Sequence, residues 1–187
     1  AHLEDVASRR AFLHWPIAFP EVLSDERRGT GAGSGFDAIV GNPPWDMVRG
    51  DSGEAGVRAG RRADAQRLTR FVRESGIYRV ETRAHVNRYQ LFVERALQLA
   101  RPGGRIGLVL PSGVASDAGA GALRRHLFDP ADIDEVTGID NREGISPIHG
   151  GLRFALVTCT RRQGAREHDR PVRCRFGVTR AEDLERD

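Results

Sequence analysis

Short apolar runs alternate along this chain with stretches in which apolar residues recur every three or four positions. The short runs predict strands over residues 36–40, 105–111, 133–139, 153–160 and 172–178. The periodic stretches predict helices over 63–76, over 117–129, and from Asn87 to a stop at Pro102, Gly103 and Gly104. Strands that alternate with helices predict an α/β layered domain with a mostly parallel sheet.

The same pattern predicts which helix faces are buried. We expect Leu68, Phe71 and Val72 to share one stripe, and the helix from Asn87 to bury Leu91, Phe92, Ala96, Leu97 and Leu99. Residues 51–62 lack periodicity and are typical of a loop or lid. Two prolines predict that residues 1–23 form a short helix and then an extended segment. Thr179 and Glu182 have the spacing of a capping box before a short final helix.

The first predicted strand ends in an unusual turn, Asn42-Pro43-Pro44-Trp45. A loop that only reverses the chain has no reason to expose an indole. Two consecutive prolines fix two φ angles and remove two backbone donors, so the turn presents rigid carbonyl acceptors beside an aromatic ring. In open α/β sheets ligands bind at the carboxyl ends of strands, where this turn lies, as does the Pro111–Gly113 segment.

Such a turn fits a planar group that carries an amine. The amine donates to the Asn42 side chain and the Pro43 carbonyl, while its ring stacks on Trp45. Two hydrogen bonds from the nitrogen localise its lone pair and prepare it to attack a methyl group held in line. The alternative is a purely structural turn in which Trp45 packs into the hydrophobic core.

Four segments in this order, among them "FLHWPIAFPEVL" and "FDAIVGNPPW", resemble the adenine-specific DNA methyltransferase domains of the Eco57I-like restriction-modification family. The other two are "RYQLFVERALQLARPGGRIGLVLPSG" and "NREGISPIHGGLRFALVTCT". The resemblance implies a Rossmann-like fold and methyl transfer from S-adenosylmethionine to the N6 amine of a flipped adenine. That activity would belong to a restriction-modification or related phage-defence system. Asn42 and Pro43 would accept from the amine, Pro44 would keep the turn rigid, and Trp45 would stack on the base.

One part of the family pattern is missing. The glycine-rich cofactor loop and the acidic residues of the first three strands should precede the turn, yet only 41 residues come before Asn42. "GTGAGSG" precedes a strand, and no lysine serves it. We therefore expect residues 1–187 to form a single, partial methyltransferase domain with an exposed sheet edge, from a truncated product or a longer polypeptide that also holds the cofactor or specificity segment. Its cofactor-binding residues stay unassigned.

Charge adds a candidate for the DNA surface. The formal net charge is +3 and all 29 basic residues are arginine. Ten of them fall within the segment 46–88, against six acidic residues, which marks a basic insertion directly after the turn. A solvated helical face and a phosphate-contacting surface both explain such a run.

The remaining side chains predict no other chemistry. Cys159 and Cys174 lie in apolar stretches and are expected to be free core thiols, whereas Asp37 should find a charged partner. The histidines lack metal-ligand spacing, and Ser112 is expected in a strand-to-helix connection without catalytic partners. Neither a membrane span nor a signal peptide is evident, so we expect a soluble cytoplasmic protein.

Two other functions fit the turn. RNA guanine and protein glutamine methyltransferases use Asn-Pro-Pro with a following Tyr or Phe, whereas this chain has Trp45 and a long basic insertion. An inactive module that only binds nucleic acid, or that assembles with a separate cofactor-binding chain, is the third hypothesis. Steep salt dependence of DNA binding without binding of S-adenosylmethionine would favour it.

Overall fold

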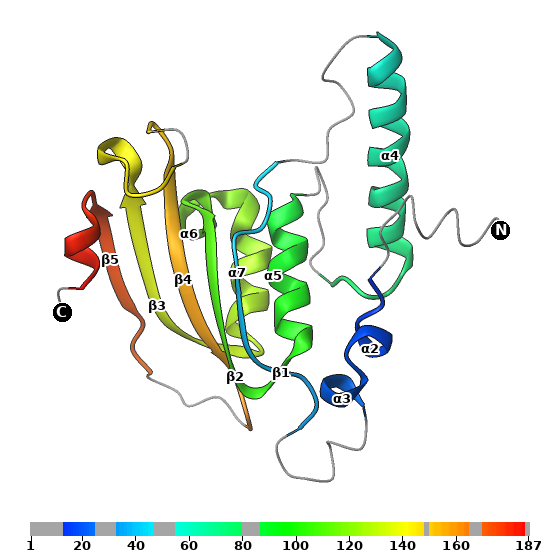
Figure 1. Ribbon diagram of the computed structural model, residues 1–187, viewed down its shortest axis with the longest axis horizontal. Coiled ribbons are helices and arrows are strands. Elements are labelled where there is room, and N and C mark those ends of the chain that lie inside the picture. The colour runs from blue at the N-terminus through cyan, green and yellow to red at the C-terminus, as the bar shows by residue number, and fades with distance from the viewer. Residues whose placement is uncertain are drawn as a thin grey trace.

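The computed structural model describes residues 13–24, 33–46, 55–79, 87–147, 150–164 and 170–185. Five strands form one sheet in the order β1-β2-β4-β3-β5, and helices lie against it (Figure 1). The strands are β1 (Phe36–Gly41), β2 (Ala100–Pro111), β3 (Ala131–Asp140), β4 (Arg153–Arg161) and β5 (Arg173–Val178). All five predicted strands are therefore present.

Strand directions confirm an α/β fold with a mostly parallel sheet. β1 pairs in parallel with β2, and β3 pairs in parallel with β5. β4 lies between β2 and β3 and is antiparallel to both. Four strands thus run in one direction, and their carboxyl ends meet at the same edge of the sheet.

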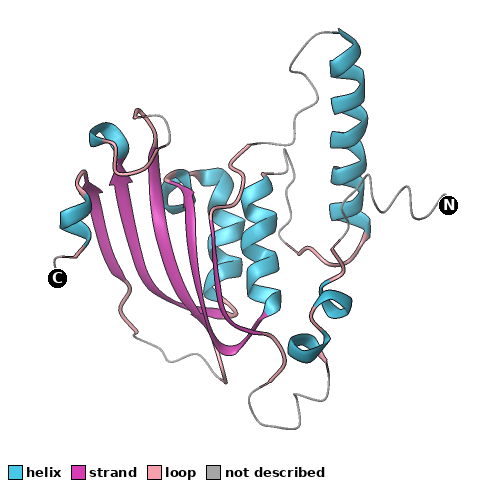
Figure 2. Cartoon of the chain, in the orientation of Figure 1, coloured by secondary structure: helices cyan, strands magenta, loops and turns pink. Residues whose placement is uncertain are grey.

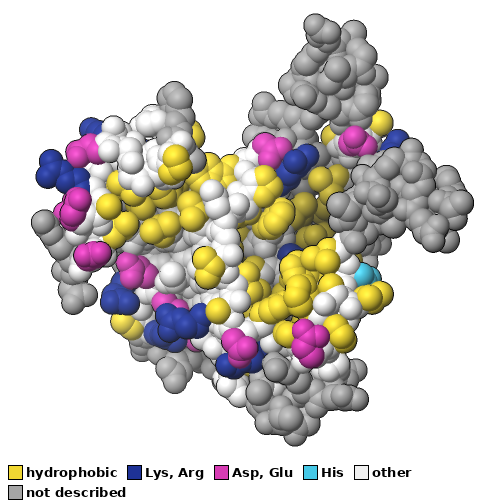
Figure 3. Space-filling view, in the orientation of Figure 1, with side chains coloured by type: hydrophobic (Ala, Val, Ile, Leu, Met, Phe, Trp, Pro, Cys, Tyr) yellow, Lys and Arg dark blue, Asp and Glu magenta, His cyan; other side chains and the backbone are white. Residues whose placement is uncertain are grey.

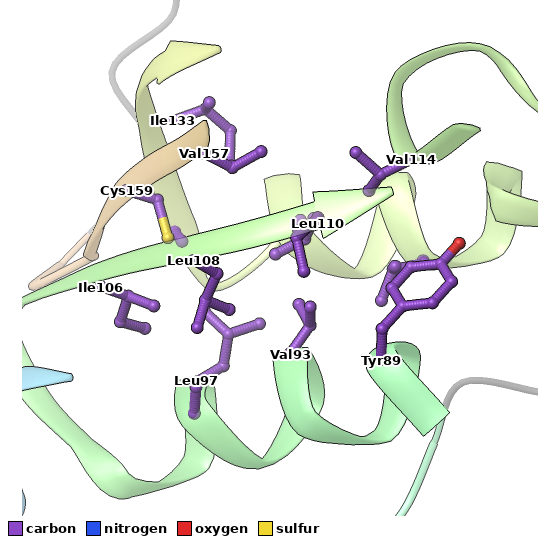
Figure 4. Close-up of a cluster of buried hydrophobic side chains, with 14 of the residues drawn as sticks. Tyr89, Val93, Leu97, Ile106, Leu108, Leu110, Val114, Ile133, Val157 and Cys159 are labelled. Carbon is purple, nitrogen blue, oxygen red and sulfur yellow. The ribbon is translucent and has the colours of Figure 1, made fainter. Parts of the chain in front are cut away.

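The main core lies between the sheet and two helices, α5 (Arg88–Leu99) and α7 (Gly121–Phe128). Tyr89, Val93 and Leu97 are spaced along one face of α5 and point toward β2 (Figure 4). On β2 the alternating residues Ile106 and Leu108, with Leu110 beyond them, complete this contact. The secondary-structure view shows both helices on one side of the sheet (Figure 2).

The opposite sheet face carries a smaller cluster. Ile139, Phe154 and Val178 are buried there, and Val109 packs against them. Successive residues of a strand point to opposite faces, so Val109 lies on the other side of β2 from Leu108 and Leu110. This second cluster lies near the carboxyl ends of β2 and β3 and packs against Trp45, which follows β1.

The prediction of a loop over residues 51–62 is wrong from Ala55 onward. Helix α4 runs from Ala55 to Glu74, so the helix predicted from residue 63 begins eight residues earlier. Alanine and arginine have high helix propensity, but the prediction relied on apolar periodicity, which this stretch lacks. Residues 51–54 lie outside the described part of the chain. Most of the basic segment 46–88 that the structure describes is therefore this one helix.

Helix α5 buries the expected residues except Phe92, but it does so against two different partners. Val93 and Leu97 face the sheet, whereas Phe92 leaves 53% of its surface exposed. Leu91 is buried, but against Val72 and Leu68 of α4 instead of the sheet. The sequence pattern predicted that Leu91 and Leu97 lie on one buried face, because it does not show that α4 covers part of α5.

Three predictions at element ends are also wrong. The segment expected to be extended forms two helical turns, α2 (Trp15–Ala18) and α3 (Pro20–Leu23), while residues 1–12 lie outside the described part. Strand β2 begins at Ala100, before the Pro-Gly-Gly sequence that was expected to stop the helix. The last helix is a 3-10 turn, Ala181–Leu184, whose N-cap is Arg180 without a side-chain cap, so Thr179 forms no capping box.

A glycine controls where β1 starts. Gly35 has φ +131°, and a Cβ there would lie 2.5 Å from the backbone nitrogen of Arg101. Only a residue without a side chain allows β1 to approach β2 at this point. Asp37, two residues later, accepts a hydrogen bond from Arg101 Nε at 2.6 Å, which confirms the expected partner for its charge.

Candidate functional site

The Asn-Pro-Pro-Trp turn follows β1 directly. β1 ends at Gly41, which is paired with Leu108, and residues 42–46 leave the sheet without regular structure. Asn42 and Pro44 are exposed, whereas Pro43 is buried. The turn therefore presents the Asn42 amide to solvent while Pro43 packs it against the protein.

Trp45 is half-buried and held in a fixed orientation. Its indole Nε1–H donates a hydrogen bond to the backbone carbonyl of Val109 at 3.2 Å. Its ring lies 6.1 Å from the ring of Phe154, centroid to centroid, at an interplanar angle of 35°. Trp45 also packs against both hydrophobic clusters, so it links the turn to the two faces of the sheet.

The far end of the turn is attached to helix α5. Arg88 Nη1 lies 3.3 Å from Asp46 Oδ2, and the backbone N–H of Arg88 donates to the Asp46 carbonyl at 3.3 Å. Both side chains are about half exposed, so the ion pair contributes about 0–1 kcal/mol. Its structural effect is to join the turn to the first residue of α5.

A loop after β3 forms the neighbouring part of the site. Asn141 is fully buried; its Oδ1 accepts from the Ser146 N–H at 2.9 Å, and its Nδ2 donates to the Ser146 carbonyl at 3.1 Å. Between them Gly144 adopts a left-handed φ of +75°. Ile145 from this loop packs in the same cluster as Trp45. Sequence reasoning missed Asn141, although an asparagine three residues before a glycine is a turn signal.

Asp140 gives this edge of the sheet a fixed negative charge. Arg142 donates a hydrogen bond to its carboxylate at 2.6 Å, and Arg153 donates a second at 3.3 Å. The hydrogen bond from Arg142 lowers the pKa of Asp140 from 3.8 to about 2, although desolvation opposes the shift. Asp140 is therefore ionised at neutral pH.

The other residues singled out from the sequence have structural positions. Ser112 lies between β2 and the short helix α6 (Gly113–Ser116), as expected, and its N–H donates to the Arg153 carbonyl at 3.3 Å. Cys159 is buried in the core, but Cys174 is exposed on β5, so the expectation of two core thiols is wrong for Cys174. "GTGAGSG" reaches into the described residues only at its last three positions, just before β1.

The described ranges contain neither a metal-binding cluster nor a membrane-spanning helix. Over those ranges, no three His, Cys, Asp or Glu side chains are grouped closely enough to hold a metal ion. Nor does any helix within them combine the length and the apolar character needed to cross a membrane. The space-filling view instead shows hydrophobic side chains gathered over the sheet face that α5 and α7 leave uncovered (Figure 3).

A family model matches residues 2–144, which contain the turn, α4, α5 and β2, and its description is Eco57I restriction-modification methylase. The chain belongs to this methylase family. The match confirms the resemblance to the Eco57I-like restriction-modification family seen in the sequence. None of the curated proteins compared with this methylase chain matches it.

One solved structure supports the methyltransferase fold. A protein from Listeria monocytogenes described as a class I S-adenosylmethionine-dependent methyltransferase aligns with a TM-score of 0.52 at 11% identity. That alignment covers 77% of the methylase chain and 38% of the Listeria protein. The M protein of the type I restriction enzyme EcoKI aligns with a TM-score of 0.44 at 20% identity, over 75% of this chain and 23% of its own. This methylase chain therefore spans well under half the length of either protein.

Proposed function

We propose that this chain carries the base-binding part of an adenine-N6 DNA methyltransferase. The observation that supports the proposal is the position of the Asn42-Pro43-Pro44-Trp45 turn, at the carboxyl end of a strand in a chain of the Eco57I methylase family. The exposed Asn42 amide and the rigid carbonyls beside it fit an exocyclic amine.

In this proposal the turn activates the nucleophile. The Asn42 side-chain oxygen and the Pro43 carbonyl accept the two N–H groups of adenine N6, which localises the nitrogen lone pair. S-adenosylmethionine supplies an electrophilic methyl group on a sulfonium. The turn binds the amine and not the cofactor in this proposal. We assign no cofactor-binding residue, because the described residues before β1 contain no glycine-rich loop between a strand and a helix.

Trp45 would provide the surface on which the flipped base stacks. A base taken out of the duplex loses a few kcal/mol of stacking and pairing energy, and an aromatic partner restores about 1–3 kcal/mol. The hydrogen bond to Val109 and the contact with Phe154 fix the indole before the base arrives. A fixed ring loses little side-chain entropy when the base binds.

The exposed edge of β1 supports the proposed location of the cofactor-binding part. Asp37, Ala38 and Val40 are exposed, Val40 to 87%, and among the described strands β1 pairs only with β2. Further strands of a methyltransferase sheet would pair along this edge. They would bring the methyl donor to the carboxyl end of β1, next to the turn.

Methyl transfer to DNA tests the proposal. The chain and the full-length product of its reading frame are each incubated with labelled S-adenosylmethionine and mixed DNA, and the modified base is identified by mass spectrometry. We expect N6-methyladenine from the full-length product, and loss of at least 100-fold in rate for Asn42→Ala, about the effect of removing one transition-state hydrogen-bond partner.

The matched control is Asn87→Ala, which makes the same chemical change at the N-cap of α5, where the side chain forms no capping hydrogen bond. This variant should retain activity. An Asn42→Ala enzyme that still methylates adenine, or label that enters only RNA or protein, overturns the proposal.

A further inference from the structure

The rotation of helix α4 about its own axis is fixed by its apolar side. Val72 is buried against Leu91 of α5, and Ala65 and Leu68 pack against the same pair. Phe71 meets the ring of Tyr78 edge-on at 6.3 Å, and Tyr78 belongs to the same small cluster. Between Arg62 and Glu74, the arginines and Gln66 on the remaining sides of α4 are exposed.

The segment after α4 is also held by α5. Gln98 Nε2 donates to the Ile77 carbonyl at 2.6 Å. The backbone N–H of Arg79 donates to the carboxylate of Glu94, a residue with no exposed surface. Since Arg88 at the start of α5 also contacts Asp46, the same helix positions α4 and the Asn-Pro-Pro-Trp turn.

One solvent-facing side of α4 is basic. We call it the basic face; it consists of Arg62, Gln66, Thr69, Arg70 and Arg73, which line a shallow depression together with Ala65 and Glu74. At 3.6 residues per turn these positions form one stripe, and from Arg62 to Arg73 it extends about 16 Å along the helix axis. In Figure 1 the helix reaches beyond the level at which β1 ends.

The arginines of this face are available for a ligand. Neither Arg62 nor Arg73 has an acidic partner among the residues that the structure describes, and both are exposed. Arg70 lies 2.9 Å from Glu74, but the two side chains are 76% and 62% exposed. An exposed pair of this kind contributes about 0–1 kcal/mol, so a phosphate group replaces the carboxylate at little cost.

We propose that the basic face of α4 binds the phosphate backbone of the DNA duplex whose base enters the turn. The proposal rests on the proposed function, because it takes DNA as the substrate. Duplex DNA presents one negative charge per about 1.7 Å of axis, so a 16 Å row of arginines meets several phosphates. The contact carries no sequence information; it orients the duplex relative to Trp45.

The test is the salt dependence of duplex binding by the full chain, measured by fluorescence anisotropy with a labelled DNA duplex. Each phosphate contact contributes about 0.9 to the slope of log K against log salt concentration. The double variant Arg62→Gln/Arg73→Gln should therefore reduce the slope by about 1.8. Between 50 and 200 mM salt, its affinity should fall about 12-fold less than that of the unmodified chain.

A matched control removes the same charge elsewhere. Arg125 and Arg173 are exposed on α7 and β5, so Arg125→Gln/Arg173→Gln changes the net charge equally and should leave the slope within about 0.5. If both double variants lower the slope equally, only net charge matters and the proposal is wrong. A greater loss of binding to duplex RNA than to duplex DNA overturns it as well.

The outcomes separate the two proposals. If the chain binds duplex DNA and the basic-face variant keeps the original slope, this proposal fails while the methyltransferase proposal stands. If the basic-face slope falls but Asn42→Ala leaves methyl transfer unchanged, the basic face is confirmed and the role of the turn is wrong. A chain that binds no duplex at low salt contradicts the basic-face proposal, whereas methyl transfer by the full-length product still decides the methyltransferase proposal.

Discussion

The indole N–H of Trp45 donates to the backbone carbonyl of Val109, 64 residues away in the sequence, at 3.2 Å. Through this bond the last residue of the candidate motif is attached to the strand beside it. Trp45→Phe keeps an aromatic ring but removes the donor, and a lost hydrogen bond of this kind costs about 1 kcal/mol. We expect the free energy of unfolding, measured by urea denaturation, to fall by that amount.

The control is Trp15→Phe, whose indole has no hydrogen-bond partner in the described ranges and which packs against Phe19 and Phe36. It should change the free energy of unfolding less than Trp45→Phe does. Equal effects from the two variants would show that ring size, and not the bond to Val109, stabilises the turn.

Leu91 and Phe92 are neighbours on α5 with different environments, which gives a second prediction. Leu91 is 7% exposed and packs against α4, whereas Phe92 is 53% exposed. Leu91→Ala should lower the free energy of unfolding by about 2–3 kcal/mol and speed amide hydrogen exchange in α4. Phe92→Ala should cost less than about 1 kcal/mol. The reverse order would contradict the helix orientation described here.

The lowered pKa of Asp140 makes the free energy of unfolding depend on pH in the acid range. Its pKa is about 2 in the folded protein, below the ordinary value of 3.8, because Arg142 donates a hydrogen bond to it. A lowered pKa stabilises the folded state above pH 3.8, and this contribution is lost as the pH falls from there through about 2. Asp140→Asn should therefore make the free energy of unfolding less sensitive to pH over this window.

NMR titration of the Asp140 carboxyl carbon measures the same effect directly. Arg142→Gln should raise its pKa toward 3.8, whereas Arg180→Gln, which removes the nearby pair with Glu143, should leave it unchanged. An Asp140 pKa that is insensitive to Arg142→Gln would mean that another group lowers it.

The two cysteines should differ in reactivity. Burial raises the pKa of Cys159 to about 12, with a smaller contribution from the charge of Asp134, while Cys174 is exposed. Because the thiolate is the nucleophile, one thiol per folded chain should react with a disulfide reagent at pH 8, and two after unfolding. Cys174→Ser should abolish the reaction of the folded chain; two reactive thiols in the folded chain would contradict the buried position of Cys159.

The sequence predicted the strands well because each is a short apolar run with turn residues on both sides. Ile106, Leu108 and Leu110 alternate on β2 as a strand requires, and the turn after β1 was located from Asn42 to Trp45 alone. The helix faces were harder. Leu91 is as apolar as Leu97, and only the packing of α4 shows that they contact different partners.

Other features depend on contacts that no local pattern contains. The bond from Trp45 to Val109 and the pair of bonds from Asn141 to Ser146 arise only when β2, β3 and the turn lie together. The start of α4 at Ala55 was missed because its first turns carry arginine, glycine and alanine instead of an apolar stripe.

The pairing of β1 with β2 also has a consequence for how the protein folds. Ile39 pairs with Ile106, and α4 and α5 lie between them in the chain, so this pairing closes a long loop. Closing such a loop costs entropy before it gains contacts, whereas β3 and β4 are joined by a much shorter connection. We expect β1 to join the sheet late in folding, so that the Asn-Pro-Pro-Trp turn forms only after the rest of the sheet exists.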